Sequence, residues 1–171
     1  MTDDQLTPEL EAAIREGYDR RDRADMAPTI AYFRGLLETH PDHPVLTYEV
    51  GGAYDTAGEE ATARGYYERA LELGLRGDAR RRCLCQYGST LRWLGELDAS
   101  LAVLDRAREE FPTSDAVRVF RGLTLLDADR ADEAAAELLT VIVDHGDATD
   151  LGRWAIGLRG LADWLSAGRP E

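Results

Sequence analysis

The sequence contains no lysine and no asparagine, and all 20 of its basic residues are arginine. Because lysine and asparagine use AT-rich codons, the simplest origin is a GC-rich genome. Acidic residues outnumber basic ones, which gives a formal net charge of −13. Such a field repels nucleic acid and anionic membrane surfaces, so we expect neither as a partner. Adaptation to salt would explain the acidity equally well.

Cysteine is scarce, and long apolar runs are absent. The two cysteines, Cys83 and Cys85, point about 200° apart on a helix and form no CxxC motif, which argues against a disulfide framework or a structural zinc site. We expect two small, buried or half-buried side chains.

No apolar stretch reaches the roughly 18 residues that span a bilayer, and the acidic start "MTDDQLTPEL" is unlike a secretory signal. The predicted location is the cytoplasm.

Motifs for catalysis and cofactor binding are also missing. The sequence has no P-loop, GxGxxG or HExxH pattern. His40 and His43 lie in a proline-rich corner, and His145 lies in "DHGDATD", which lacks the ligand spacing of a calcium loop. No nucleophile has an evident base. We therefore predict a protein that is not an enzyme and binds no cofactor or metal; a pocket of convergent polar groups would revive the enzyme hypothesis.

What the sequence does contain is an internal repeat. The segment "VLTYEVGGAYDTAGEEATARGYYERAL" from Val45 aligns with "RCLCQYGSTLRWLGELDASLAVLDRAR" from Arg82, and a third copy, "AVRVFRGLTLLDADRADEAAAELLTVI", starts at Ala116. Each copy has two apolar stretches at helical spacing on either side of a short polar corner, which predicts a helical hairpin. Three copies at similar offsets indicate a repeat architecture.

Small residues at fixed places explain why the spacing recurs. Gly51 on the first helix and Ala63 on the second allow the two backbones to approach, while Tyr54 and Tyr67 fill the space beside them. In the third copy, Gly122, Ala134 and Leu138 take the corresponding places. The same packing is therefore expected in every unit.

This pattern resembles the tetratricopeptide repeat, a helix–turn–helix unit of about 34 residues with small residues at its eighth, twentieth and twenty-seventh positions. Those positions are occupied here by Gly51, Gly88 and Gly122; by Ala63, Ser100 and Ala134; and by Ala70, Ala107 and Val141. The resemblance implies an all-α fold, a right-handed solenoid of antiparallel helix pairs. It is specific for fold and generic for function.

The expected organisation is a single repeat domain over residues 1–171. Its units are a degenerate one at about 10–43 and three further ones at 44–77, 81–114 and 115–148. In the first unit Gly17 takes the glycine place, and Pro28 is tolerable only in the first turn of the second helix, with Asp25 as a plausible cap. An apolar stripe predicts a capping helix at about 149–166, which would cover the last hairpin.

The resemblance also implies that first helices line an inner groove. The residues expected there to bind a partner are Tyr18, Arg21, Tyr48, Asp55, Arg82, Ser89, Arg92, Trp93 and Leu123. Tyrosine, tryptophan and arginine are enriched at binding hot spots. Alternatively, Arg82, Arg92 and Trp93 are solvated or locally paired side chains, and Leu123 simply receives the final helix.

Two functions remain open from the sequence. The first is an interaction module that binds a peptide or partner protein in the groove, and a ligand with an acidic group and hydrophobic anchors would suit it. The second is a self-associating, homodimeric protein with no peptide ligand, in which the apolar stripe of the last helix or third unit forms the contact. The lysine- and asparagine-containing clamp of chaperone-binding relatives is not carried over, because neither residue type is present.

Overall fold

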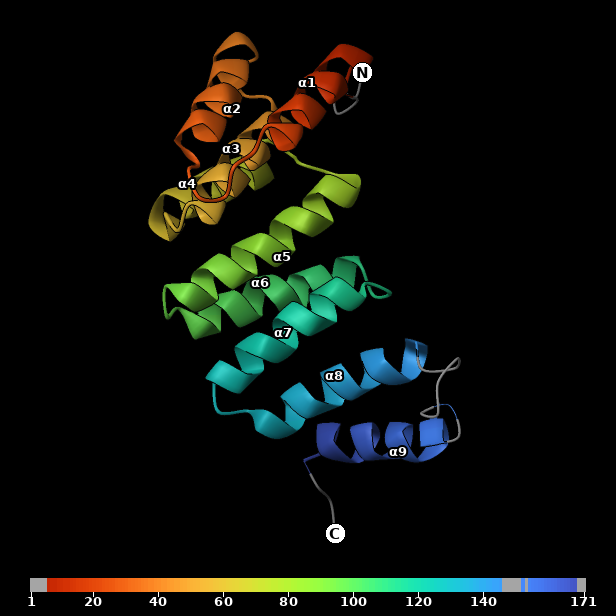
Figure 1. The fold of residues 1–171 in the computed structure, drawn as a ribbon. Helices are drawn as coiled ribbons and strands as arrows, with labels where there is room; N and C mark the ends of the chain where they lie inside the picture. Colours follow the sequence, from red (N-terminus) through yellow and green to blue (C-terminus); the bar gives the residue numbers. More distant parts are fainter. Residues whose placement is uncertain (1–5, 146–151, 153, 169–171) are drawn as a thin grey trace. The chain divides into compact units, whose positions relative to one another are not determined.

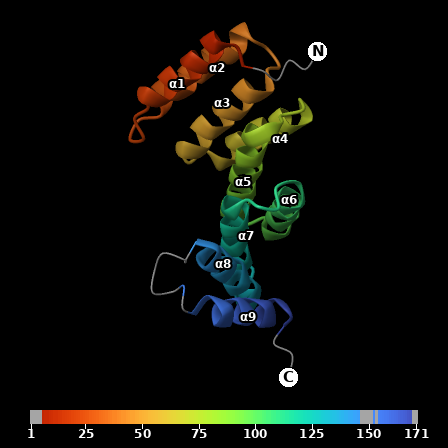
Figure 2. The same cartoon turned by 90° about the vertical axis from the view of Figure 1, so that its right-hand side faces the viewer.

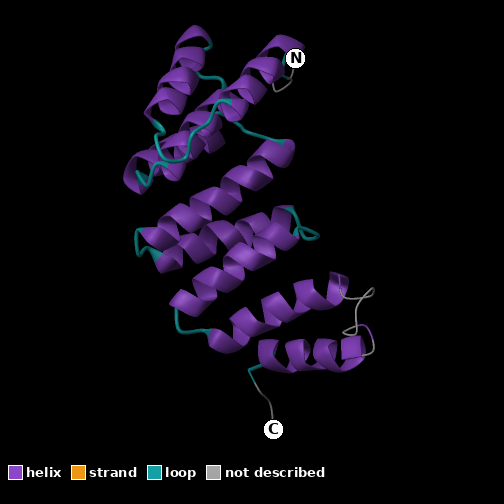
Figure 3. Cartoon of the chain, in the orientation of Figure 1, coloured by secondary structure: helices purple, strands orange, loops and turns teal. Residues whose placement is uncertain are grey.

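The structure, a computed structural model, describes residues 6–145, 152 and 154–168. Within these residues it contains nine helices and no strand (Figures 1 and 3). The helices are α1 (Pro8–Asp19), α2 (Ala27–Thr39), α3 (Pro44–Thr56), α4 (Glu60–Glu72), α5 (Gly77–Trp93), α6 (Leu97–Glu110), α7 (Asp115–Asp127), α8 (Ala131–His145) and α9 (Ala155–Ser166). The all-α prediction is confirmed.

The chain forms two compact units. The first covers residues 1–94 with helices α1 to α5, and the second covers residues 95–171 with helices α6 to α9. Within each unit, helices that follow one another in the chain pack as antiparallel neighbours (Figures 1 and 2). The expected single domain over residues 1–171 stays a prediction.

In the first unit, the packing of α3 on α4 follows the predicted small-to-large rule. A Cβ atom added to Gly51 would lie 2.9 Å from two ring carbons of Tyr67 and 3.1 Å from Cβ of Tyr66. Ala63 and Tyr67 are fully buried beside it. The missing side chain of Gly51 therefore makes room for the tyrosine ring between the two helices.

The degenerate hairpin of α1 and α2 uses the same arrangement. A Cβ atom on Gly17 would lie 2.6 Å from Cζ of Phe33, and Phe33 is buried. Pro28 falls in the first turn of α2, as expected, where its missing N–H removes no helical hydrogen bond. Asp25 is not the cap that the sequence predicted: the N-cap of α2 is Met26, and the Asp25 carboxylate accepts a hydrogen bond from the backbone N–H of Ala27 at 3.2 Å in the turn before the helix.

In the second unit, α8 lies between α7 and α9 (Figure 1). A Cβ atom on Gly122 of α7 would lie 3.3 Å from two carbons of Leu138 on α8, the predicted partner. Helix α9 buries Ala162 and Leu165 against Ala136 and its neighbours on α8. The final helix thus packs on the last hairpin, although the structure starts it at Ala155 and the first residues of the predicted cap, 149–151, lie outside the described ones.

One expectation for α9 is not met. The interpretation that Leu123 receives the final helix is wrong, because α9 packs on α8 and Leu123 stays exposed on α7. The small residues of α8 allow α9 to pack closely against that helix, whereas the larger apolar residues of α7 do not.

Both cysteines are buried and free, as predicted. Burial raises the pKa of the Cys83 thiol to about 12 and that of the Cys85 thiol to about 11, so both are neutral, unreactive thiols at neutral pH. Among the described residues, no helix is both long and apolar enough to cross a bilayer.

Candidate functional site

The first unit contains an open cavity of about 270 Å³ whose walls come from α1, α3 and α5. These are the three first helices of the hairpins in this unit, the ones that the repeat pattern assigned to the inner face. Apolar side chains, among them Ile14 and Val45, form part of the wall, and charged side chains and Tyr18 form the rest. Two of the predicted partner-binding residues, Tyr18 and Arg82, line this cavity.

A buried carboxylate, that of Glu49 on α3, lies at the base of the cavity. Glu49 is only 2% exposed, and the hydroxyl of Tyr18 donates a hydrogen bond to it. Burial raises the pKa of Glu49 above its ordinary value, while the Tyr18 hydroxyl and the guanidinium groups of Arg82 and Arg21 act against that rise. The pKa of Tyr18 is raised as well, first by burial and then by Glu49. The hydrogen bond joins α1 to α3 through a carboxyl group that is buried inside the unit.

Tyr48 lies deeper than the sequence suggested. Its ring is buried, and its hydroxyl donates to Oε1 of Gln86 on α5 at 2.6 Å. The guanidinium of Arg82 lies over the Tyr48 ring, 5.7 Å from its centroid, and also pairs with Asp78 at 3.2 Å. The Tyr48 ring therefore forms a cation–π contact with Arg82 and, being buried, leaves little of its own surface for a partner.

Asp55 also connects helices. Its carboxylate accepts hydrogen bonds from Thr90 Oγ1 on α5 at 2.9 Å and from the Tyr67 hydroxyl on α4 at 3.2 Å. Burial raises the pKa of Asp55, and these two hydrogen bonds oppose the rise. The two hydrogen bonds join α3 to α4 and α5, so both oxygens of the Asp55 carboxylate are engaged inside the unit.

The remaining predicted residues lie apart from this cavity. Arg21 lies over the Tyr18 ring at 5.2 Å, and Arg92 over the Trp93 ring at 5.0 Å. Trp93, at the end of α5, is 68% exposed, whereas Ser89 is half-buried. Leu123 belongs to the second unit. The structure thus brings together Tyr18, Arg21, Tyr48 and Arg82 around Glu49, and it does not bring all nine predicted residues to one place.

The cavity also contains residues that the sequence did not single out. Arg15 and Arg76 line it with Arg82, and so do Glu11 and Glu49. Arg15 forms no ion pair with any residue that the structure describes. Of the other two arginines, Arg82 pairs with Asp78 at 3.2 Å. The sequence contains one indication that Glu49 is buried: it is the only charged residue between His43 and Asp55.

A second, wider cavity of about 490 Å³ lies between α2 and α4 on the other helices of the hairpins. It contains none of the predicted residues. Arg69 on its wall already pairs with Asp42 at 2.9 Å and with Glu72 at 3.3 Å. Its larger volume gives no chemical reason to prefer it as a site.

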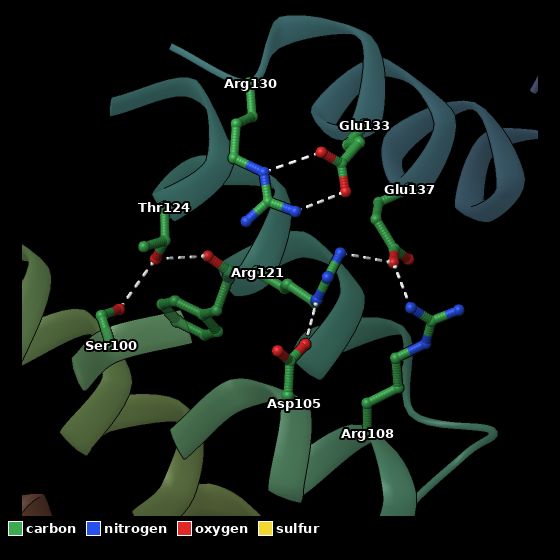
Figure 4. A network of polar contacts seen from close by, with 9 residues as sticks. Ser100, Asp105, Arg108, Arg121, Thr124, Arg130, Glu133 and Glu137 are labelled. Carbon is green, nitrogen blue, oxygen red and sulfur yellow. Dashed lines mark hydrogen bonds and ion pairs between the residues drawn. The ribbon is translucent and has the colours of Figure 1, made fainter. Parts of the chain in front are cut away.

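The second unit has a polar network that joins α6, α7 and α8 (Figure 4). The guanidinium of Arg121 on α7 pairs with Asp105 at 2.6 Å and with Glu137 at 3.0 Å, and Arg108 also reaches Glu137, at 2.9 Å. The Arg121 and Glu137 side chains are only 10% and 7% exposed. Nearby, the Ser100 and Thr124 hydroxyls lie 3.0 Å apart. These groups pair with one another inside the unit, and the network joins its three helices.

No group of three or more histidine, cysteine or acidic side chains among the described residues is arranged to hold a metal ion. The geometry therefore defines a protein built from stacked helical hairpins, with a concentration of arginine and tyrosine on the first helices of one unit.

The comparisons agree with this class. A family model described as tetratrico peptide repeat matches residues 44–149. The chain belongs to the tetratricopeptide repeat family, whose repeats generally mediate protein–protein interaction. A comparison with curated proteins finds no match.

Proposed function

We propose that this protein is an interaction module that binds a peptide segment of a partner protein along the first helices of its first unit. The observation that supports the proposal is the open cavity among α1, α3 and α5, where Tyr18 and Arg82 meet over the buried Glu49. A cavity that combines apolar walls with a few converging polar groups is typical of ligand sites.

The wall chemistry indicates which peptide would bind. Arg15 and Arg82 would hold an acidic group, a side-chain or terminal carboxylate, through charge-assisted hydrogen bonds. Ile14, Val45 and Ala79 would receive a hydrophobic side chain beside it. The ligand is therefore an acidic segment with at least one apolar residue next to its carboxylate.

The other predicted residues would extend the contact or support it. Arg21 and the exposed Trp93 would meet flanking parts of the peptide, while Tyr48 and Asp55 would hold the helices in place beneath. Ser89, Arg92 and Leu123 stay predicted contacts of a longer partner.

The test selects binders with the full-length chain from a random peptide library and measures the affinity of the enriched peptides by calorimetry. We expect enrichment of acidic peptides with an adjacent apolar residue. Replacing Arg82 by alanine should weaken their binding at least about 10-fold, because a hydrogen-bonded charge pair contributes about 1.5–3 kcal/mol. Arg15→Ala should act in the same direction.

The matched control is Arg106→Ala, because Arg106 is an exposed arginine on α6 that pairs with Glu110 away from the cavity. It should leave affinity unchanged. Equal affinity for the wild type, Arg82→Ala and Arg15→Ala would remove the cavity from the binding surface, whereas a library without any enriched peptide would count against the peptide-binding function itself.

A further inference from the structure

The two acidic side chains that are buried among the described residues differ in their charge partners. They are Glu49 in the first unit and Glu137 in the second. Glu137 pairs with Arg121 at 3.0 Å and with Arg108 at 2.9 Å. Glu49 accepts one hydrogen bond, from the Tyr18 hydroxyl, and forms no ion pair with a described residue. Burial of a carboxylate without an ion pair is unfavourable, so it shifts the equilibrium of Glu49 towards the neutral form.

The titratable and charged side chains around Glu49 come from α1, from the turn after it, from α5 and from α3 itself. They are Glu11, Arg15, Tyr18, Arg21, Tyr48, Arg76 and Arg82. Helices α2 and α4 contribute no titratable side chain to either cavity that Glu49 lines. The guanidinium groups of Arg82 and Arg21 favour the ionised carboxylate, although neither forms an ion pair with it. The ionisation of Glu49 therefore depends on charges that lie around the cavity rather than on a direct partner.

An acidic ligand would change this balance in one direction. In the proposed function, Arg15 and Arg82 hold the carboxylate of the ligand. The ligand then brings a second negative charge into the cavity that Glu49 lines, and it offsets the positive charge of Arg82, which favours ionised Glu49. A nearby like charge and the loss of a nearby cation both favour the neutral form of a carboxyl group. Ligand binding and protonation of Glu49 therefore reinforce each other.

The proton goes to Glu49 rather than to the ligand. The ligand carboxylate would lie between two guanidinium groups, which stabilise its ionised form. The carboxyl of Glu49 is only 2% exposed and has a single hydrogen-bond donor, the Tyr18 hydroxyl. Of the two carboxyl groups, that of Glu49 thus gains more from becoming neutral.

We propose that the cavity among α1, α3 and α5 binds an acidic ligand together with one proton, which the carboxyl of Glu49 takes up from water. The proposal rests on the proposed function and adds the regulation of that site, because the affinity for an acidic peptide then depends on pH. A peptide in which the acidic side chain is replaced by its amide brings no second negative charge and takes up no proton.

The direction of the pH dependence follows from linkage. Burial raises the pKa of Glu49 above its ordinary value of 4.5 in the free chain, and the ligand carboxylate would raise that pKa further in the complex. Between these two pKa values the complex holds a proton that the free chain lacks, so the affinity increases as the pH falls through this range. The range lies above 4.5, where an aspartate or glutamate side chain of the ligand is still ionised.

The first test uses the full chain without ligand. Carbon-13 NMR follows the carboxyl carbon of Glu49 as a function of pH, and the signal is assigned by its absence from Glu49→Gln. We expect a titration midpoint above 4.5. In Tyr18→Phe the midpoint should move to higher pH, because the Tyr18 hydroxyl stabilises the ionised carboxylate. A midpoint at or below 4.5 would overturn the proposal whether or not a peptide binds.

The second test counts protons. Its probe is the acidic peptide most enriched in the library selection, with blocked termini, and the same peptide with its acidic side chains replaced by amides. Calorimetry in two buffers of different ionisation enthalpy gives the number of protons taken up on binding. We expect uptake approaching one proton for the acidic peptide and none for its amide form. The affinity for the acidic peptide should fall at least about 10-fold from about pH 5 to about pH 8, because a rise of about one in a pKa corresponds to a tenfold change in affinity.

Two variants assign the proton. Glu49→Gln keeps the size of the side chain and should abolish the proton uptake, with an unchanged helical circular dichroism spectrum as the check on folding. The matched control is Glu11→Gln, which replaces an exposed carboxyl that lines the same cavity and should leave the uptake in place. An acidic peptide that binds without proton uptake, or with the same uptake to Glu49→Gln, would overturn this proposal and leave the peptide-binding function intact. A selection without any binder would count against both.

Discussion

Replacing Gly51 by alanine should destabilise the first unit, although alanine is the better helix former. The new Cβ atom would lie 2.9 Å from two ring carbons of Tyr67, well inside the optimal carbon–carbon separation of about 3.5–4.0 Å. The ring cannot move away easily, because Tyr67 is fully buried and its hydroxyl bonds to Asp55. The helices would have to separate locally.

The expected size follows from two opposing effects. An extra methyl group in a tightly packed core costs about 1–3 kcal/mol. Alanine recovers about 1 kcal/mol relative to glycine in a helix interior. We therefore expect a net loss of about 1 kcal/mol in the free energy of unfolding of the first unit. Gly35→Ala is the matched control: its Cβ atom would meet nothing within 4 Å, so it should gain about 1 kcal/mol.

Urea unfolding followed by near-ultraviolet circular dichroism would measure both variants. All seven tyrosines lie in residues 1–94, so the tyrosine signal reports on the first unit. A Gly51→Ala protein that is as stable as Gly35→Ala would show that the ring contact does not limit helix approach, and the packing account of the repeat would fail with it.

Three further predictions concern the buried polar groups. Arg121→Met should destabilise the second unit by about 3 kcal/mol, because it leaves buried Glu137 with one arginine fewer. In the same urea titration, breaking the exposed ion pair of Arg106 should change the free energy of unfolding by less than about 1 kcal/mol. Glu49→Gln should stabilise the protein at neutral pH. Because the pKa of Glu49 is raised in the folded state, this carboxyl favours folding most at pH values below its ordinary pKa of 4.5, and it loses that contribution as the pH rises through the folded pKa. The stability gained by the glutamine variant should therefore grow with pH from about 4.5 upward and disappear in acid. A stability difference that is constant with pH would contradict this origin. Native protein at pH 8 should react with a thiol reagent far more slowly than unfolded protein, because burial raises the pKa of Cys83 and Cys85, and equal rates would contradict their burial.

Much of the fold could be predicted because helix packing leaves a periodic record in the sequence. The glycine and alanine spacing identified the hairpins and named Tyr67 and Leu138 as the residues that fill the space beside Gly51 and Gly122, and both contacts are present. The outer face of α9 could not be assigned this way. Its apolar residues have the same spacing whether they face α8 or solvent, and only the packing of Ala162 on α8 separates the two faces.

The candidate site was predicted less completely. The pattern placed Tyr18 and Arg82 on the inner helices, and they do line one cavity. It also named Tyr48 as a contact, yet the ring is buried, and it missed Glu49, which is the centre of the cluster. Which polar residues of a helix are buried depends on the two other helices beside it, and a repeat pattern records only the nearest partner.

The sequence by itself determined that this chain consists of helical hairpins, because small residues recur at similar intervals where successive helices pack closely. The tertiary structure alone decided where charge is buried and where apolar surface is left outside. Glu49 beneath Tyr18, Arg121 against Glu137 and Ile156 in solvent are each set by three-dimensional neighbours that lie far apart in sequence, or are missing altogether, and no local pattern encodes them.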